Sequence, residues 1–149
     1  MRIVIQRVTR ASVSIEGRVE SAIEKGMMVL LGVGYADTDD DIDWLVKKTI
    51  NLRIFNDSEG VMNLSVKDVE GSILVVSQFT LMASCKKGNR PSYIHAASPD
   101  VSVPLYERFC QRLSEELGKP VSTGVFGADM QVELVNDGPV TIVIDSKEK

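Results

Sequence analysis

Alternating and apolar runs dominate the first third of the chain and predict β-strands. Residues 2–8 (RIVIQRV) are largely apolar, and residues 12–17 (SVSIEG) and 17–26 (GRVESAIEKG) alternate between apolar and polar positions. Residues 27–33 (MMVLLGV) form a continuous apolar run that is typical of a buried strand. The pattern predicts four strands joined by glycine-containing turns, as a meander or a pair of hairpins.

Two later segments have helical periodicity. In the first, apolar and small positions recur at helical spacing after an acidic first turn, which predicts a helix over about residues 39–52; these positions are Ile42, Leu45, Val46, Thr49 and Ile50. In the second, Pro99 and Pro104 frame the start of the helix and Gly118 is a suitable stop. Its apolar stripe consists of Leu105, Tyr106, Phe109, Cys110, Leu113 and Leu117.

The remaining strands flank polar or unusual segments. Residues 71–81 (GSILVVSQFTL) begin as a buried strand and end in polar residues, and residues 55–63 (FNDSEGVMN) read as a turn-rich connector. Two final strands are expected at about 129–135 and 140–145, with Gly138–Pro139 between them. The order β-β-β-β-α-β-α-β-β predicts one mixed α+β domain over residues 1–149, with sheets layered against two helices.

Composition points to an ordinary soluble protein. Hydrophobic residues make up 44% of the 149 and charged residues 26%. The longest apolar run, residues 27–31, is too short to cross a bilayer, and the N-terminal segment lacks the features of a signal peptide. We therefore expect a cytoplasmic protein with no membrane partner.

The net charge of −4 argues against non-specific binding to duplex DNA, which depends on many phosphate contacts. It leaves room for a local basic patch that grips one end of an RNA. Lys86, Lys87 and Arg90 are the candidates for that patch, and the alternative is an ordinary solvated loop.

Cysteine and histidine are too few for most metal or disulfide chemistry. Cys85 and Cys110 form no CxxC motif and are expected as reduced thiols in or near the core. His95 is the only histidine, so a metal site would lack the usual second histidine. We expect no metal and no cofactor.

Residues 77–80 (Ser-Gln-Phe-Thr) place polar groups where a buried strand ends, which is a common position for a site. A serine or threonine nucleophile needs a base, but His95 is eighteen residues from Ser77 and no GxSxG motif surrounds that serine. The hydroxyls could equally be structural. Backbone amides near the strand end could form an oxyanion hole.

The Gly138–Pro139 pair is unexpected between two strands, since proline donates no ladder hydrogen bond and glycine weakens a strand interior. It is either a plain turn or a point where the chain needs an unusual backbone shape. Strands on both sides raise the chance of a cis peptide above its usual frequency.

Five segments, in order along the whole chain, resemble the D-aminoacyl-tRNA deacylase family. They are MRIVIQRVTRASV (1–13), SQFTL (77–81), GNRPSYIHAA (88–97), TGVFGADM (123–130) and NDGPVTIVID (136–145). The resemblance implies hydrolysis of the ester that joins a D-amino acid or glycine to the 3′ end of tRNA. It also implies a homodimer of three-layer β/β/α subunits with barrel-like sheets and two sites at the subunit interface.

The resemblance also assigns roles to residues. Gly138 and Pro139 would form a cis peptide that enters the partner's pocket and rejects L-aminoacyl groups by steric clash, and Arg7 would hold this segment through hydrogen bonds to backbone oxygen. Ser77 and Gln78 would shape the pocket and Met130 would line it. Thr80 is one candidate nucleophile.

A second mechanism has the 2′-hydroxyl of the tRNA assist a water molecule while amides near Phe79 hold the ester, and we favour it because Thr80 has no evident base. Two other functions stay open: a serine or threonine esterase for a small metabolite, and a non-enzymatic dimeric tRNA-binding module.

Overall fold

The computed structural model describes residues 1–149. In chain order the elements are β1 (Arg2–Ile15), β2 (Arg18–Ile23), β3 (Gly26–Gly32), α1 (Asp39–Asn51), β4 (Phe55–Asn56), β5 (Met62–Leu64), β6 (Ser72–Ser77), the 3₁₀ helix η1 (Phe79–Met82), α2 (Pro99–Leu117), β7 (Ser122–Thr123) and β8 (Gln131–Asp145). None of the helices is long and apolar enough to span a membrane.

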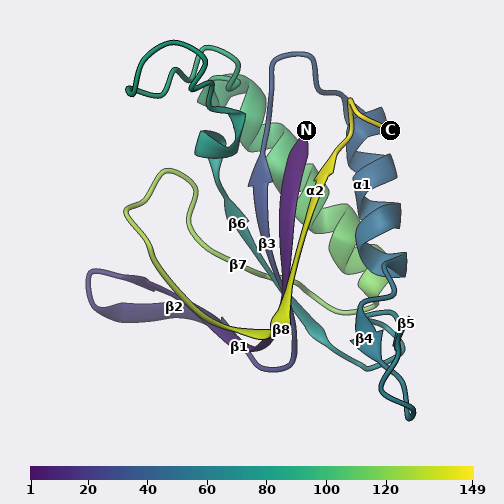
Figure 1. Cartoon of the computed structure of the whole chain (residues 1–149). Helices are drawn as coiled ribbons and strands as arrows, with labels where there is room; N and C mark the ends of the chain where they lie inside the picture. The colour runs from purple at the N-terminus through teal and green to yellow at the C-terminus, as the bar shows by residue number, and fades with distance from the viewer.

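The long strand β1 organises the main sheet because it pairs with three other strands. Its first half is antiparallel to β3 and its second half to β2, while β8 runs antiparallel along its other edge over both halves. β6 lies parallel to β3, and β7 lies parallel to β6. The short strands β4 and β5 form a separate hairpin. Figure 1 shows both helices behind the strands and the β1–β2 hairpin projecting away from them.

Apolar residues on the two faces of β3 and β6 build two separate cores. Met27 and Val29 on β3 face the two helices, and they belong to a core of 22 buried residues. Met28 and Leu74 face the other way, into a smaller core of seven buried residues that includes Val13 from the second half of β1. Because β2 packs across β6 and β7, the sheet folds over itself. The result is helices, a central sheet and a second β layer, which confirms the predicted three-layer fold.

Both predicted helices are present with nearly the expected bounds. At the start of α1, the Thr38 backbone N–H donates to Asp41 Oδ2 at 2.8 Å in a capping box, and three aspartates occupy the first turn. At the end of α2, Gly118 adopts a left-handed conformation with φ of 85° and its N–H donates to Ser114 O. These local signals are the reason why the helix ends could be read from the sequence.

The structure corrects the expected strand count in the first third of the chain. Residues 2–8 and 12–17 were expected as two strands, but β1 runs through both as one strand. No glycine or proline interrupts residues 9–11, and β8 pairs on both sides of this point. The only sharp turn comes at Glu16 and Gly17, both with positive φ. The segment 55–63, which was expected as a connector, forms most of the β4–β5 hairpin. The strand β7 was not expected, because two residues are too few to show an alternating apolar pattern.

The two expected C-terminal strands are likewise one element, β8, with a large bulge at Gly138–Pro139. Gln6 on β1 pairs with Thr141, and Val8 pairs with Asn136. Arg7 alone therefore stands opposite the four residues Asp137–Val140, which leave the ladder as a loop. The Gly138–Pro139 peptide is cis. The pair is thus neither a plain turn nor a regular strand.

Candidate active site

A pocket of about 260 Å³ opens at the end of β6. Its walls come from the ends of β3 and β6, from α2 and from the segment between β7 and β8, and ten of its fifteen lining residues are hydrophobic. The lining residues are Leu31, Val33, Val76, Ser77, Gln78, Phe79, Ala97, Ser102, Tyr106, Phe126, Gly127, Ala128, Asp129, Met130 and Val132. The volume is slightly below the range of about 300–1,000 Å³ that is usual for ligand pockets, so it suits one small group.

The predicted site segment 77–80 forms one corner of this pocket. The Gln78 backbone N–H donates to Leu31 O at 2.8 Å, which extends the β3–β6 ladder by one residue before the chain turns into η1. The backbone N–H groups of Phe79 and Thr80 lie in the first turn of this 3₁₀ helix, where they have no partner within the helix, and no side chain caps them. These two N–H groups are therefore the candidate donors for an oxyanion site at this end of the pocket.

Thr80 is placed beside the pocket rather than in its lining. Its only side-chain partner is the amide of Gln78, whose Nε2 donates to Thr80 Oγ1. An amide cannot accept the hydroxyl proton as a base. His95 lies with Cys85 along a different cleft, near the start of β1. The structure therefore brings no general base to Thr80.

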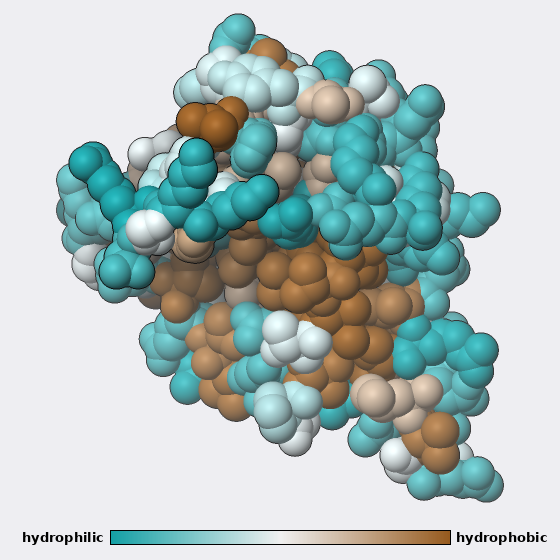
Figure 2. Space-filling view, turned by 45° about the horizontal axis from the view of Figure 1, so that its top comes forward, coloured by the Kyte–Doolittle hydropathy of each residue, from teal (hydrophilic) through white to brown (hydrophobic).

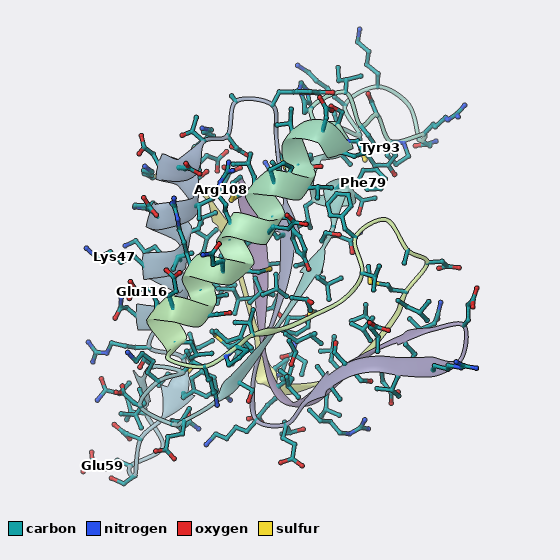
Figure 3. All side chains as sticks on the ribbon, turned by 180° about the vertical axis from the view of Figure 1, so that it is seen from behind. Lys47, Glu59, Phe79, Tyr93, Arg108 and Glu116 are labelled. Carbon is teal, nitrogen blue, oxygen red and sulfur yellow. The ribbon has the colours of Figure 1, made fainter.

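Phe79 stands at the rim of the pocket with 56% of its surface exposed. Its ring meets that of Tyr93 edge-to-face, with 5.1 Å between the ring centroids, and Figure 3 shows the two side by side near the start of α2. The exposed loop with Lys86, Lys87 and Arg90 precedes Tyr93, and residues 71–99 contain no acidic residue. The pocket rim is thus aromatic, and the basic loop lies towards the other cleft, where Lys86 lines the wall with Cys85 and His95.

Arg7 and the Gly138–Pro139 bulge form a second group that contributes nothing to the pocket of their own chain. Arg7 is buried, and its Nε donates to the backbone oxygen of Asp137 at 3.0 Å. Its Nη1 donates to Ile54 O at 2.8 Å and to Asn56 Oδ1 at 3.2 Å. Gly138 and Pro139 are themselves exposed. A buried guanidinium therefore anchors an exposed loop.

Two ionisable groups near the pocket stay protonated at neutral pH. Burial raises the pKa of the Tyr106 hydroxyl well above its ordinary value, and this hydroxyl donates to Val75 O at 3.3 Å. Burial also raises the pKa of the Cys110 thiol to about 12. Neither group is a base or a nucleophile in this state. No group of three His, Cys, Asp or Glu side chains is placed to hold a metal ion.

The sequence alone missed several residues that line the pocket. Tyr106 was read only as part of the apolar stripe of α2, where its spacing is that of a core residue. Ser102, Phe126 and Asp129 carried no signal of their own. Phe126 and Asp129 do belong to the TGVFGADM segment, so the family resemblance was the one signal that could have drawn attention to them.

Comparison with known proteins gives consistent matches over the full length. A family model described as D-Tyr-tRNA(Tyr) deacylase matches residues 4–145. A Bacteroides fragilis (strain YCH46) protein named D-aminoacyl-tRNA deacylase is 66% identical over 149 residues, covering 100% of this chain and 99% of that protein. A Flavobacterium johnsoniae protein of the same name is 60% identical with the same coverage.

Two solved structures share the fold. One, described as c-Myc DNA Unwinding Element Binding Protein, is 43% identical with a TM-score of 0.91 and covers 97% of this chain and 98% of its own. Another, described as a probable eukaryotic D-amino acid tRNA deacylase, is 20% identical with a TM-score of 0.82 and covers 96% and 97%, which supports the fold alone. Together with the family model and the curated relatives, these matches show that the chain belongs to the D-aminoacyl-tRNA deacylase family.

Proposed function

We propose that the protein hydrolyses the ester bond of D-aminoacyl-tRNA, and of glycyl-tRNA, to release the free amino acid and tRNA. The observation that carries the proposal is the pocket at the end of β6. There Ser77, Gln78 and Phe79 of the SQFT segment line a small, mainly apolar cavity, and the uncapped first turn of η1 follows them, which supports an oxyanion site formed by backbone amides. The 66% identity to a protein named D-aminoacyl-tRNA deacylase supports an aminoacyl-tRNA as the substrate.

The geometry favours hydrolysis by water over a threonine nucleophile, because Thr80 has only an amide as its partner. In this mechanism a water oxygen bonds to the ester carbonyl carbon while the backbone amides of Phe79 and Thr80 stabilise the oxyanion. The bond from that carbon to the ribose 3′-oxygen then breaks. The neighbouring 2′-hydroxyl relays the proton from the attacking water to the 3′-oxygen.

A second copy of the chain completes the site in our proposal. β8 pairs only with β1, so its other edge has no strand partner, and Val132, Val135 and Val143 on β8 are exposed. Figure 2 shows a broad apolar area on one face of the molecule, which is typical of a protein interface. A homodimer would cover this surface.

In such a dimer the exposed Gly138–Pro139 loop would reach the pocket of the partner. The hydrogen bond from Arg7 to Asp137 O and the one from the Val140 N–H to Asn136 Oδ1 stiffen the loop from both ends. Rigid carbonyls would clash with the side chain of an L-aminoacyl group, whereas a D-side chain points away and glycine has none. The selectivity is therefore steric, and Ser77, Gln78 and Met130 shape the cavity that remains.

The tRNA end would approach over the exposed basic loop that precedes Tyr93. Lys86, Lys87 and Arg90 can contact phosphates of the 3′ strand. With a net charge of −4, the chain has little else to attract RNA, so the contact would stay local to the acceptor end. The same charge argues against duplex DNA as a partner, although one structural relative is described as a DNA-element binding protein.

The direct test offers paired D- and L-aminoacyl-tRNAs to the purified protein and measures release of the amino acid. We expect rapid hydrolysis of the D-ester and little of the L-ester. Equal rates for both would refute the steric selection. Replacing the terminal 2′-hydroxyl by hydrogen should slow turnover strongly, and undiminished turnover would reject assistance by the tRNA.

The same assays separate the two other functions. A small-ester hydrolase that uses Thr80 would keep its rate on an aminoacyl ester of a simple alcohol, where the deacylase would lose most of its activity. A binding module would retain tRNA without hydrolysing either ester.

A further inference from the structure

A second cleft, of about 770 Å³, has no part in the proposed chemistry. It lies at the other end of η1 from the pocket, since Phe79 at the start of η1 lines the pocket and Met82 at its end lines the cleft. We propose that this cleft binds the nucleotide that precedes the terminal adenosine of the tRNA, with its base on the ring of Tyr35 and its phosphate beside Lys86. This inference rests on the proposed function and adds a binding site to it.

Backbone pairing brings two distant loops together to form the cleft. Gly34, which follows β3, forms an antiparallel β-bridge with Ala96. The next pair of residues in this register is Tyr35 and His95, and both line the cleft. A Cβ on Gly34 would lie 3.1 Å from Met82 Cε, so the close approach of the loops to the end of η1 requires a glycine here. The fold thus places a phenol and an imidazole ring along one cleft.

Two large apolar side chains in this cleft are exposed without a role in the chain's own packing. Tyr35 is 59% and Ile94 74% exposed, and both line the cleft. The exposed valines on which the dimer proposal rests lie on β8, whereas these two residues lie in loops beyond the ends of the strands, so the dimer does not account for their exposure. Bases of single-stranded RNA stack on tyrosine and histidine rings, which suits this surface.

The charged groups of the cleft favour a phosphate on one side only. Asp37 accepts from the Gly34 N–H at 2.6 Å and Asp145 pairs with Arg2 at 2.9 Å, so these two carboxylates already have partners. Lys86 is exposed and forms no ion pair in the chain. Glu148 also lines the cleft but belongs to the C-terminal segment, and Figure 1 shows that segment and the loop after η1 on opposite sides of the start of β1. A phosphate would therefore lie on the Lys86 side.

The distance between the two cavities matches successive nucleotides. A 3₁₀ helix rises about 2 Å per residue, so the first and last of the four residues of η1 are only about 6 Å apart along its axis. When the ester on the terminal ribose lies at the pocket, the preceding nucleotide can reach the cleft across this short helix. The cleft would then hold the tRNA end in place while its ester is hydrolysed.

The test is a cycle of two proteins and two substrates. The proteins are the unmodified chain and Tyr35→Ala, and the substrates are D-phenylalanyl-tRNA and the same tRNA with an abasic ribose as its penultimate nucleotide. On the complete tRNA we expect Tyr35→Ala to lower kcat/KM about fivefold, mainly through KM, which is the lower end of what base stacking contributes. Removal of the base should lower kcat/KM of the unmodified protein by a similar factor. On the abasic tRNA the two proteins should have the same kcat/KM, because the stacking partner is already absent.

Two further variants separate the ring from the charge. Tyr35→Phe keeps the ring and should retain the kcat/KM of the unmodified protein on the complete tRNA. Lys86→Ala should make kcat/KM fall less steeply with rising salt concentration, because one phosphate contact is lost. Lys67→Ala is the matched control, since Lys67 is also exposed but lines a separate groove beside Gly118, and it should leave the salt dependence unchanged.

Equal losses for Tyr35→Ala on both tRNAs, or no loss on the complete tRNA, would overturn the inference while leaving the deacylase function intact. A change in the oligomeric state of Tyr35→Ala would also overturn it, because a second copy of the chain would then cover the ring. Failure of the unmodified protein to hydrolyse D-phenylalanyl-tRNA would instead refute the proposed function.

Discussion

Replacing Arg7 by glutamine tests how strongly a single buried side chain holds the β8 bulge. The Arg7 side chain is 9% exposed and donates to three oxygens, those of Asp137, Ile54 and Asn56. Glutamine is too short to reach all three, and Ile54 O lies where water has little access. Each hydrogen bond from a charged group contributes roughly 1.5–3 kcal/mol, and a buried oxygen without a donor costs about 1–3 kcal/mol.

Part of this loss is offset because the guanidinium no longer has to be removed from water. We therefore expect Arg7→Gln to lower the free energy of unfolding by about 3 kcal/mol. For a protein of 149 residues this corresponds to a fall in Tm of about 6–12 °C. Because the loop is also the proposed gate, the ratio of D- to L-ester hydrolysis should fall in the same variant.

The assay is urea and thermal unfolding at one fixed protein concentration, because association would otherwise shift the apparent stability. Arg10→Gln is the matched control, since Arg10 lies on the same strand and forms a surface ion pair with Glu133 at 3.3 Å. The two side chains of this pair are 60% and 70% exposed, so its loss should cost under about 1 kcal/mol. A difference between the two variants of less than about 1 kcal/mol would refute the view that Arg7 anchors the bulge.

Three further predictions test other parts of the molecule. In Gly138→Ala the new Cβ would lie 2.9 Å from Val140 Cγ2 and 3.0 Å from Arg7 Nη2 at a φ of +127°, so we expect a loss of about 1–3 kcal/mol in urea unfolding and weaker D/L discrimination. An unchanged D/L ratio would count against the steric gate. Thr80→Ala should slow single-turnover hydrolysis of D-aminoacyl-tRNA by less than about tenfold, because the hydroxyl has no base; complete loss of activity in a folded variant would identify a nucleophile. Burial opposes ionisation of Asp41, but hydrogen bonds from Ser146, the Thr38 backbone and Lys147 outweigh it and hold the pKa of Asp41 far below its ordinary 3.8. The ionised Asp41 therefore contributes fully to the free energy of unfolding above about pH 4, and this contribution is lost as the pH falls. A plot of the free energy of unfolding against pH should be flatter below about pH 4 for Asp41→Asn than for the unmodified protein. Parallel plots would contradict this.

Elements with strong local signals were predictable. The helix over 39–51 has an acidic first turn and apolar positions at helical spacing, and the helix over 99–117 has proline at its start and glycine after its end. These features act within one turn of the chain, so their effect does not depend on distant residues. The order of the strands in the sheet could not be predicted from such local features. The pairing of β8 along β1 joins residues that are 117 to 143 positions apart in the sequence, and no periodicity predicts it.

The candidate site was likewise predictable from the sequence only in part. The end of β6 was recognisable because polar residues follow an apolar strand at Ser77. The placement of Tyr106, Asp129 and Phe79 around one cavity required three segments from different parts of the chain to meet. The family resemblance named Gly138–Pro139, but the one-against-four bulge opposite Arg7 became visible only in the strand register.

Local chemistry along the chain thus sufficed for the two helices and the buried strands, and the resemblance of five segments to a known family indicated the family to which the protein belongs. Long-range pairing and packing settled which strands were continuous, how the sheet folds into two layers, and which polar groups face the pocket. The physical reason is that capping, turn and periodicity preferences act over a few neighbouring residues, whereas ladder register and cavity shape depend on contacts between residues far apart in sequence.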